Sequence, residues 1–354
     1  MALAPKKLVG NVATVFNGYG RVAFSLIPRL KTTGAQIVSA YRGAIYNNEK
    51  LKGGSNLGQL FFSHYHLKDD DSLRAAMQHS NIVINLIGKM NETKNFSFEE
   101  VHIEGPRRMA RIARQLGVEK FIHISALNCS PNPTPMVLKN GSKFLRTKYL
   151  GELAVRDEFP EAIIFRPSDI AGERDDFIVH WTSVYRSRFT NKCPIWDYYD
   201  GVEKQPVYVG DLVSGIEAAI LNDSANGKTF QAYGPHRYRF YDLIEYIRAC
   251  GGQGPNDECR ITNLRWDFLR FYISFLERIQ KYPFLTWERI ERDLHSDKID
   301  PKMPSLVDLG VQLSPLERFI AIMAHYRPRE HRYEMLYNER EPVKWPLRLD
   351  EAVA

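Results

Sequence analysis

The sequence predicts an α/β fold with a doubly wound parallel sheet, followed by a smaller C-terminal lobe and an extended tail. Two observations carry this prediction. Strand-like runs of β-branched residues alternate with helix-like runs through the first 170 residues. The first of these strands ends in a glycine turn that leads directly into a helix.

The glycine turn is the strongest single signal. The strand Val12–Phe16 stops at Asn17–Gly20, and apolar residues at helical spacing follow at once. Gly18 and Gly20 lack Cβ, so the backbone can turn tightly and approach a pyrophosphate, and the helix N-terminus offers unpaired N–H groups to it. The pattern Gly-x-Gly-x-x-Ala, which ends at Ala23, is typical of dinucleotide binding. Glycines that only make a turn would give the same spacing.

The remaining elements follow in regular order. We expect further strands at 35–41, 59–65, 81–88, 119–127 and 162–170, with helices at 70–79, 98–116 and 139–159. Shorter strands at 206–209 and 229–233 and helices at 211–221 and 241–249 indicate a smaller, substrate-side lobe, and 251–255 is expected to be a break. The predicted division is a nucleotide-binding domain at 1–170, the smaller lobe at 171–323 and an extended arm at 324–354.

An aromatic segment at 264–294 stands out in the smaller lobe. Five residues are expected to share one helical face: Leu264, Phe268, Phe271, Phe275 and Ile279. This face could pack on its own domain, or it could dock on a partner subunit or a membrane surface. Both interpretations stay open.

Composition narrows the class of partner. The 354 residues are 44% hydrophobic and carry a formal net charge of +6, which suits an anionic cofactor, an acidic partner or an anionic membrane. No run of Lys and Arg interleaved with aromatic residues occurs, so we expect no nucleic-acid binding. Four scattered cysteines and the lack of a His-Glu-x-x-His motif predict neither a disulfide framework nor a metal site. No apolar stretch is long enough to span a membrane.

The N-terminal region is basic and poor in acidic residues. The first acidic residue is Glu49, and this pattern resembles a mitochondrial presequence. Either such a presequence has been removed or Met1–Lys7 is its remnant.

Arg42 directly follows the second expected strand. A unit that prefers NAD usually carries Asp or Glu near this point, whereas an arginine can bind the 2′-phosphate of NADP(H). With no carboxylate close by, the sequence favours NADP(H), although a solvated loop arginine is the other possibility.

The chain resembles the extended and atypical short-chain dehydrogenase/reductase superfamily, which has a Rossmann nucleotide-binding domain. The resemblance rests on the glycine turn, on the strand that ends in Ser125, on the helix that carries Lys148, and on the segment Arg166–Gly172. Active members use Tyr-x-x-x-Lys, in which the tyrosine transfers the proton. Here the position four residues before Lys148 is Phe144, so the resemblance implies no catalytic residue.

Longer motifs give a closer match. Residues 78–88, 92–96, 117–123 and 204–209 closely resemble the alpha-subcomplex subunit 9 family of mitochondrial NADH:ubiquinone oxidoreductase (complex I). The resemblance implies a non-catalytic accessory subunit that binds NADPH without turning it over. It also implies a peripheral position on the matrix side of the inner membrane, beside other complex I subunits near the junction of the peripheral and membrane arms. The chain departs from the family in a shortened glycine turn.

These arguments give one set of candidate cofactor-binding residues: Asn17, Gly18, Tyr19, Gly20, Arg21, Val22, Arg42, Leu67, Leu86, Ile87, Gly88, Ser125, Lys148, Pro167 and Ile170. Two alternative functions stay open, an active NADP(H)-dependent reductase or epimerase and a free nucleotide-sensing regulator.

Overall fold

The structure, a computed structural model, describes residues 8–172, 176–182, 192–251, 260–265, 269–280, 283, 285–324 and 343–350. Three of the predicted features, the segment Met1–Lys7, most of the break after Gly251 and most of the C-terminal arm, lie outside these residues.

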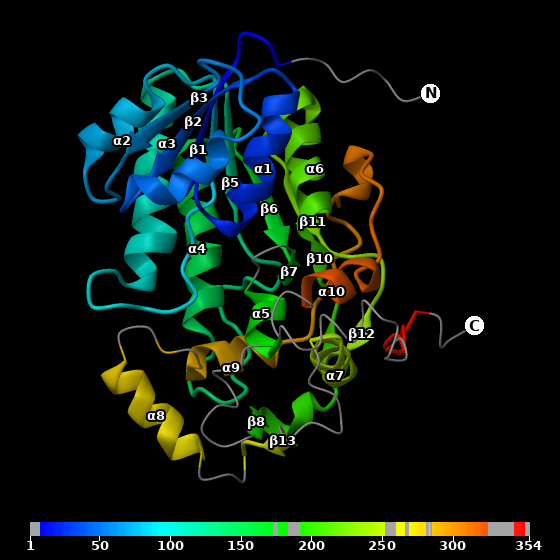
Figure 1. Ribbon diagram of the computed structural model, residues 1–354. Coiled ribbons are helices and arrows are strands. Elements are labelled where there is room, and N and C mark those ends of the chain that lie inside the picture. The colour runs from blue at the N-terminus through cyan, green and yellow to red at the C-terminus, as the bar shows by residue number, and fades with distance from the viewer. Residues whose placement is uncertain are drawn as a thin grey trace.

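A seven-stranded parallel sheet forms the centre of the molecule (Figure 1). Its order is β11-β6-β5-β4-β1-β2-β3, so the direction of winding reverses between β1 and β4. In such sheets the crevice at the carboxyl ends of the two reversing strands is the usual ligand site. The strands are β1 Val12–Phe16, β2 Gln36–Tyr41, β3 Leu60–His64, β4 Ile82–Asn85, β5 Lys120–Ile124, β6 Ile163–Pro167 and β11 Thr229–Ala232.

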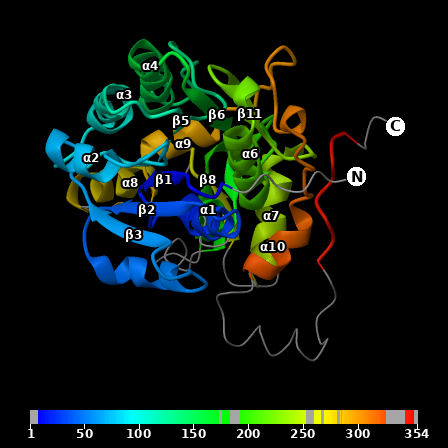
Figure 2. The same ribbon diagram turned by 90° about the horizontal axis from the view of Figure 1, so that it is seen from above.

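Helices cover both faces of this sheet (Figure 2), which confirms the predicted doubly wound α/β fold. One apolar core joins the sheet to α1 and α6, and a second joins its other face to α2, α3 and α4. The helix expected at 98–116 contains a π-helical turn, η2, ahead of α3. The bounds are α1 Arg21–Thr32, α2 Asp70–Met77, η2 Glu100–Glu104, α3 Gly105–Gln115, α4 Lys143–Glu158 and α6 Val209–Leu221, with short 3-10 helices η1 Ile45–Lys52 and η5 Asp223–Ala225.

The second lobe lies below the carboxyl ends of the strands in Figure 1 and has an aromatic core of its own around Trp181, Tyr238 and Phe240. Three two-stranded pairs support it: β7 Ile170–Ala171 with β10 Val207–Tyr208, β9 Glu203–Lys204 with β12 Tyr238–Arg239, and β8 Lys192–Ile195 with β13 Arg260–Asn263. Its helices are α5 Phe177–Thr182, α7 Phe240–Cys250, α8 Leu269–Ile279, α9 Trp287–Asp293 and α10 Glu317–Ala324, with 3-10 helices η4 Trp196–Tyr199 and η6 Val307–Leu309.

The expected boundary at residue 170 differs from the structure. Strand β11 pairs with β6 in the main sheet, where Phe230 stacks on Phe165 at 5.6 Å between ring centroids. Helix α6 packs against α1 in the same core as the first strands. The chain therefore enters the second lobe at β7 and returns to the main sheet, a path that the local sequence pattern does not reveal.

The aromatic segment is not one helix. It begins directly after β13 and contains helix α8 and helix α9. Leu264 lies in a turn before α8 and is fully buried in the second lobe, so the prediction that it shares one helical face with the other residues is wrong. Phe271, Phe275 and Ile279 do share one face of α8, with exposed fractions of 61%, 59% and 65%. Phe268 lies outside the described residues.

The described part of the C-terminal arm is extended and lies against the second lobe. Arg348 forms an isolated antiparallel bridge with Tyr238, and its Nε lies 2.9 Å from Glu317 Oε1. Leu349 N donates to Arg237 O at 2.9 Å. Among the described helices, none combines the length and the apolar character that crossing a membrane requires.

Candidate functional site: a nucleotide cavity

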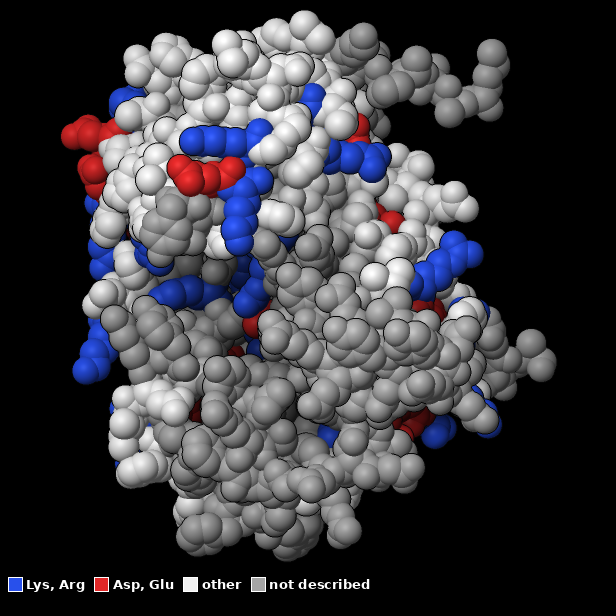
Figure 3. All heavy atoms as spheres, in the orientation of Figure 1, with Lys and Arg blue, Asp and Glu red and all other residues white. Residues whose placement is uncertain are grey.

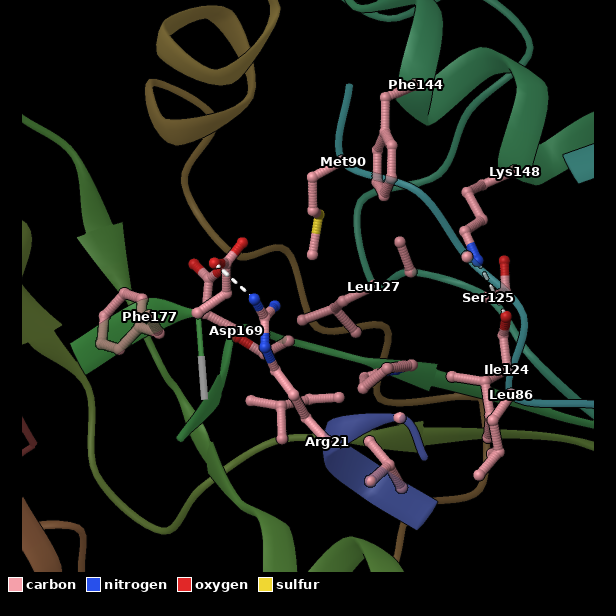
Figure 4. A pocket seen from close by; sticks show the side chains of 18 of the residues that line it. Arg21, Leu86, Met90, Ile124, Ser125, Leu127, Phe144, Lys148, Asp169 and Phe177 are labelled. Carbon is pink, nitrogen blue, oxygen red and sulfur yellow. Dashed lines mark hydrogen bonds and ion pairs between the residues drawn. The ribbon is translucent and has the colours of Figure 1, made fainter. Parts of the chain in front are cut away.

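A cavity of about 560 Å³ lies at the carboxyl ends of the strands, where the sheet order reverses. Twelve of the fifteen predicted residues line it: Asn17, Tyr19, Gly20, Arg21, Val22, Leu86, Ile87, Gly88, Ser125, Lys148, Pro167 and Ile170. Figure 4 shows Arg21 on one side and Lys148, Ser125 and Phe144 on another, with Asp169 and Phe177 opposite.

The glycine turn forms one end of the cavity. Asn17 has a φ of 60°, and Gly20 N donates to Asn17 O at 2.6 Å, which closes the turn. The Asn17 amide also donates to Leu86 O at 3.2 Å and ties the turn to the end of β4. The N-cap residue of α1 is Gly20, which has no side chain to cap the helix, so the first N–H groups of α1 are available at the cavity.

Gly18 has a packing role instead. A Cβ at this position would lie 1.9 Å from Ser39 Oγ on β2, and Gly18 is not among the residues that line the cavity. Its N–H donates to Ala40 O at 2.9 Å. The glycine is therefore required because the turn passes close to the neighbouring strand.

Lys148 and Ser125 form the polar part of the opposite wall. Lys148 is buried, its Nζ donates to Ile124 O at 3.0 Å, and burial lowers its pKa to about 8. The buried Ser125 hydroxyl makes no hydrogen bond to another described residue. A buried ammonium and an unsatisfied hydroxyl on a cavity wall are groups that a polar ligand can satisfy.

Phe144 lies at the cavity one helical turn before Lys148 (Figure 4). Its ring meets the His102 ring edge-on at 5.2 Å, and Lys148 Nζ lies 5.9 Å from its centroid. Burial lowers the pKa of His102 well below its usual value and that of His123 to about 3, so both imidazoles are neutral at physiological pH. A hydrocarbon ring, which has no proton to transfer, therefore lies at the cavity four residues before Lys148.

The second lobe supplies a wall that sequence reasoning missed. Its residues include Asp176, Arg289, Arg292 and Asp297. Asp169 Oδ2 and Lys204 Nζ, also on this wall, lie 3.5 Å apart in a buried ion pair. No local pattern marks these residues, because they come from separate elements that only the fold brings together.

Positive charge dominates the cavity wall. Six cationic side chains face three carboxylates there: Arg21, Lys89, Lys148, Lys204, Arg289 and Arg292 against Asp169, Asp176 and Asp297. The face in Figure 3 likewise shows more lysine and arginine than aspartate and glutamate among its coloured residues. This excess suits an anionic ligand such as a dinucleotide.

Arg42 and Leu67 lie outside the cavity. Leu67 is buried in the core beneath α3, where it packs on Gly105. Arg42 is exposed and its guanidinium lies 4.8 Å from the Phe96 ring centroid, with Lys68 Nζ at 5.0 Å and Lys89 Nζ at 5.5 Å from the same ring. Since Lys89 also lines the cavity, this cationic cluster adjoins it.

Comparison with known proteins identifies the family. Residues 18–233 match the model of the NAD dependent epimerase/dehydratase family. The Rattus norvegicus protein named NADH dehydrogenase (ubiquinone) 1 alpha subcomplex subunit 9, mitochondrial, is 38% identical over 340 residues, which cover 95% of this chain and 84% of the rat protein. The chain belongs to the alpha subcomplex subunit 9 family. The Neurospora crassa NADH-ubiquinone oxidoreductase 40 kDa subunit, mitochondrial, is 31% identical, with 88% of this chain and 78% of that protein covered.

Solved structures agree on the fold. UDP-glucuronic acid 4-epimerase from Bacillus cereus, solved with UDP-glucuronic acid and NAD, superposes with a TM-score of 0.63 at 15% identity. The match covers 89% of this chain and 98% of the epimerase chain. At that identity the likeness shows the fold alone. It confirms the predicted Rossmann-type architecture.

Proposed function

We propose that this protein is a non-catalytic, NADPH-binding accessory subunit of mitochondrial complex I. Its place is peripheral, on the matrix side of the inner membrane near the junction of the two arms. The observation that carries the proposal is a cavity that keeps Lys148 and Ser125 but has Phe144 where a proton donor would be needed. Complex I is proposed as the assembly because the relatives are named as its subunits.

The wall residues fit a dinucleotide. The N-terminus of α1 and the turn before it would hold the pyrophosphate, because the N-cap residue, Gly20, has no side chain to accept from the first N–H groups. Lys148 and the unsatisfied Ser125 hydroxyl would bind the nicotinamide ribose. NADPH is a hydride donor in enzymes that reduce a substrate. In this protein its binding energy would instead help to hold the two lobes together.

Preference for NADPH over NADH is assigned to the cluster on Phe96. Arg42, Lys68 and Lys89 surround one aromatic ring at the ends of β2, β3 and β4. Lys68 Nζ is paired with Glu100 Oε1 at 2.5 Å, so Arg42 and Lys89 carry the charge that would meet a 2′-phosphate.

The protein does not turn the nucleotide over in this proposal. A phenyl ring has no proton to transfer, the neighbouring histidines are neutral, and Lys148 is held by a backbone carbonyl. General acid–base catalysis commonly contributes a factor of about 10²–10⁴, which this site lacks.

The test is a turnover assay on the purified protein. We expect no NADPH oxidation with carbonyl substrates and no epimerisation of UDP-sugars, and we expect Phe144→Tyr to keep the fold because it adds one hydroxyl. Robust turnover by the unaltered protein would refute the non-catalytic assignment. Co-migration with complex I after mild detergent extraction tests the assembly, and a free monomer under those conditions would refute it.

The exposed face of α8 is the proposed contact with a neighbouring subunit or the membrane surface. Phe271, Phe275 and Ile279 lie on it, with the exposed cations Arg270 and Arg278 close by on the same helix. Apolar rings beside cations suit an anionic lipid surface or an apolar protein surface with an acidic rim.

A further inference from the structure

Asp176 stands between two arginines that come from different lobes. Its Oδ1 lies 2.9 Å from Arg21 Nη2, and its Oδ2 lies 3.3 Å from Arg289 Nη1. Arg21 is the first residue of α1, directly after the glycine turn, and Arg289 belongs to α9. All three residues line the cavity, and Figure 4 shows Arg21 reaching across it toward the side that carries Asp169 and Phe177.

The two ion pairs differ in environment. The Arg21 side chain is 51% exposed, whereas that of Arg289 is 10% exposed and also lies 3.7 Å from Asp293. Burial would raise the pKa of Asp176, but Arg289, Arg21 and Arg292 together lower it. The carboxylate is therefore charged at neutral pH, and its pair with Arg21 is the easier one to break.

Arg21 can serve either an aspartate or a phosphate. It lies at a helix N-terminus in the cavity where the N-cap residue, Gly20, has no side chain to accept from the first N–H groups, and an anion would be attracted to these groups. A guanidinium binds carboxylate and phosphate with the same planar pair of donors. The Asp176 carboxylate thus holds the cation that a bound pyrophosphate would need.

We propose that Asp176 competes with the nucleotide phosphates for Arg21. When the nucleotide binds, Asp176 pairs with Arg289 alone, and this stronger pairing stabilises helix α9. This inference rests on the proposed function, because it takes the cavity to be the nucleotide site. The Asp176 carboxylate thereby lowers the affinity of the cavity for the nucleotide. Its contact with Arg289 couples nucleotide binding to the second lobe.

Helix α9 is hydrogen-bonded to several other parts of the molecule, so a change at Arg289 can affect them. Glu291 accepts hydrogen bonds from the backbone N–H groups of Met136, Val137 and Leu138 at 2.6–2.8 Å. At the other end of α9, Trp287 Nε1 donates to Ser274 Oγ of α8 at 2.9 Å. A change at Arg289 therefore acts on a helix that is bonded to both lobes and to the exposed helix α8.

The experiment measures NADPH affinity by titration calorimetry for the full chain, Asp176→Asn, Arg21→Gln and the double variant. We expect Asp176→Asn to tighten binding by about twofold to fivefold, the range for a partly exposed ion pair. In the Arg21→Gln background the same substitution should change affinity little. Glu217→Gln is the matched control. Glu217 of α6 pairs at 2.6 Å with Arg29 of α1, the helix that also carries Arg21, but Glu217 does not line the cavity.

Tightening that persists in the Arg21→Gln background would overturn the proposal, since it would show simple charge repulsion. Unchanged affinity in Asp176→Asn would overturn it as well. If Asp176→Asn does not fold, hydrogen exchange on the unaltered protein decides: NADPH should slow exchange in 287–293, and equal exchange with and without NADPH refutes the coupling. Absence of NADPH binding by the unaltered chain would instead refute the proposed nucleotide site itself.

Discussion

Nucleotide binding by this protein should weaken as the pH rises through 8, because Lys148 loses its charge in that range. Lys148 is buried, and burial lowers the pKa of its ammonium from 10.5 to about 8 in spite of the nearby Cys129 and Glu152. An anionic ligand stabilises the charged form, so the pKa of Lys148 must be higher in the complex than in the free protein. Binding above pH 8 then requires the uptake of a proton, and affinity falls with rising pH.

The size of the effect follows from the pKa. With a value of about 8, roughly nine-tenths of the free protein carries the charge at pH 7 and roughly one-tenth at pH 9. The dissociation constant for NADPH should therefore rise about tenfold between pH 7 and pH 9, which is about 1.4 kcal/mol.

Calorimetry in two buffers with different ionisation enthalpies measures both the affinity and the proton uptake. Lys148→Met is the control, because it removes the charge and keeps an unbranched chain of similar length. Its affinity should be lower than that of the unaltered protein at pH 7 and nearly independent of pH up to 9. A flat profile for the unaltered protein, or an equal fall in the Lys148→Met variant, would refute the assignment of the titration to Lys148.

Three other predictions address the cofactor, the buried Glu291 of helix α9 and the exposed face of helix α8. Arg42→Ala should weaken NADPH about fivefold and NADH less than about twofold, since Arg42 is exposed and its contact with a phosphate is partly screened; equal losses would contradict it. Glu291→Gln should lower the free energy of unfolding by about 1–3 kcal/mol in a denaturant melt, because a fully buried carboxylate that accepts three backbone N–H groups loses its charge. Phe271→Ser with Phe275→Ser should leave the melt of the isolated protein nearly unchanged but reduce incorporation into complex I, and an early melt would place these rings in the core instead.

Local patterns were enough to predict the first six strands and the glycine turn. Each of these strands is a short run that is rich in apolar residues, so its type can be predicted without knowing its partners. Strand β11 has the same local pattern, yet its place beside β6 depends on pairing across more than sixty residues of chain. Leu264 shows a similar limit, because helical spacing alone does not reveal that this residue lies in a turn after β13 and is buried in the second lobe.

The candidate site likewise contains residues that the sequence predicts and residues that only the fold brings to the cavity. The turn, Gly88, Ser125 and Lys148 lie at strand or helix ends that periodicity locates, and the structure brings them to one cavity. Asp176, Arg289 and Arg292 lie on the opposite wall, but each is an ordinary charged residue in its own segment. Their role arises from distances between lobes, such as the 2.9 Å between Arg21 and Asp176, which no sequence period encodes.

Phe144 is better understood as a structural contact than as a missing group. Glu288 of α9 accepts from the Ser142 hydroxyl at 2.5 Å and from Phe144 N at 2.8 Å, which fixes the start of α4. The Arg292 guanidinium lies 5.0 Å from the Phe144 ring centroid, a cation–π geometry that a desolvated phenyl ring favours. Helix α4 is thus held by the second lobe at Phe144, four residues before Lys148. A nucleotide on Lys148 and the contacts of Glu288 and Arg292 with Phe144 would then stabilise the same helix from two sides, so that bound NADPH would have a structural effect without any turnover.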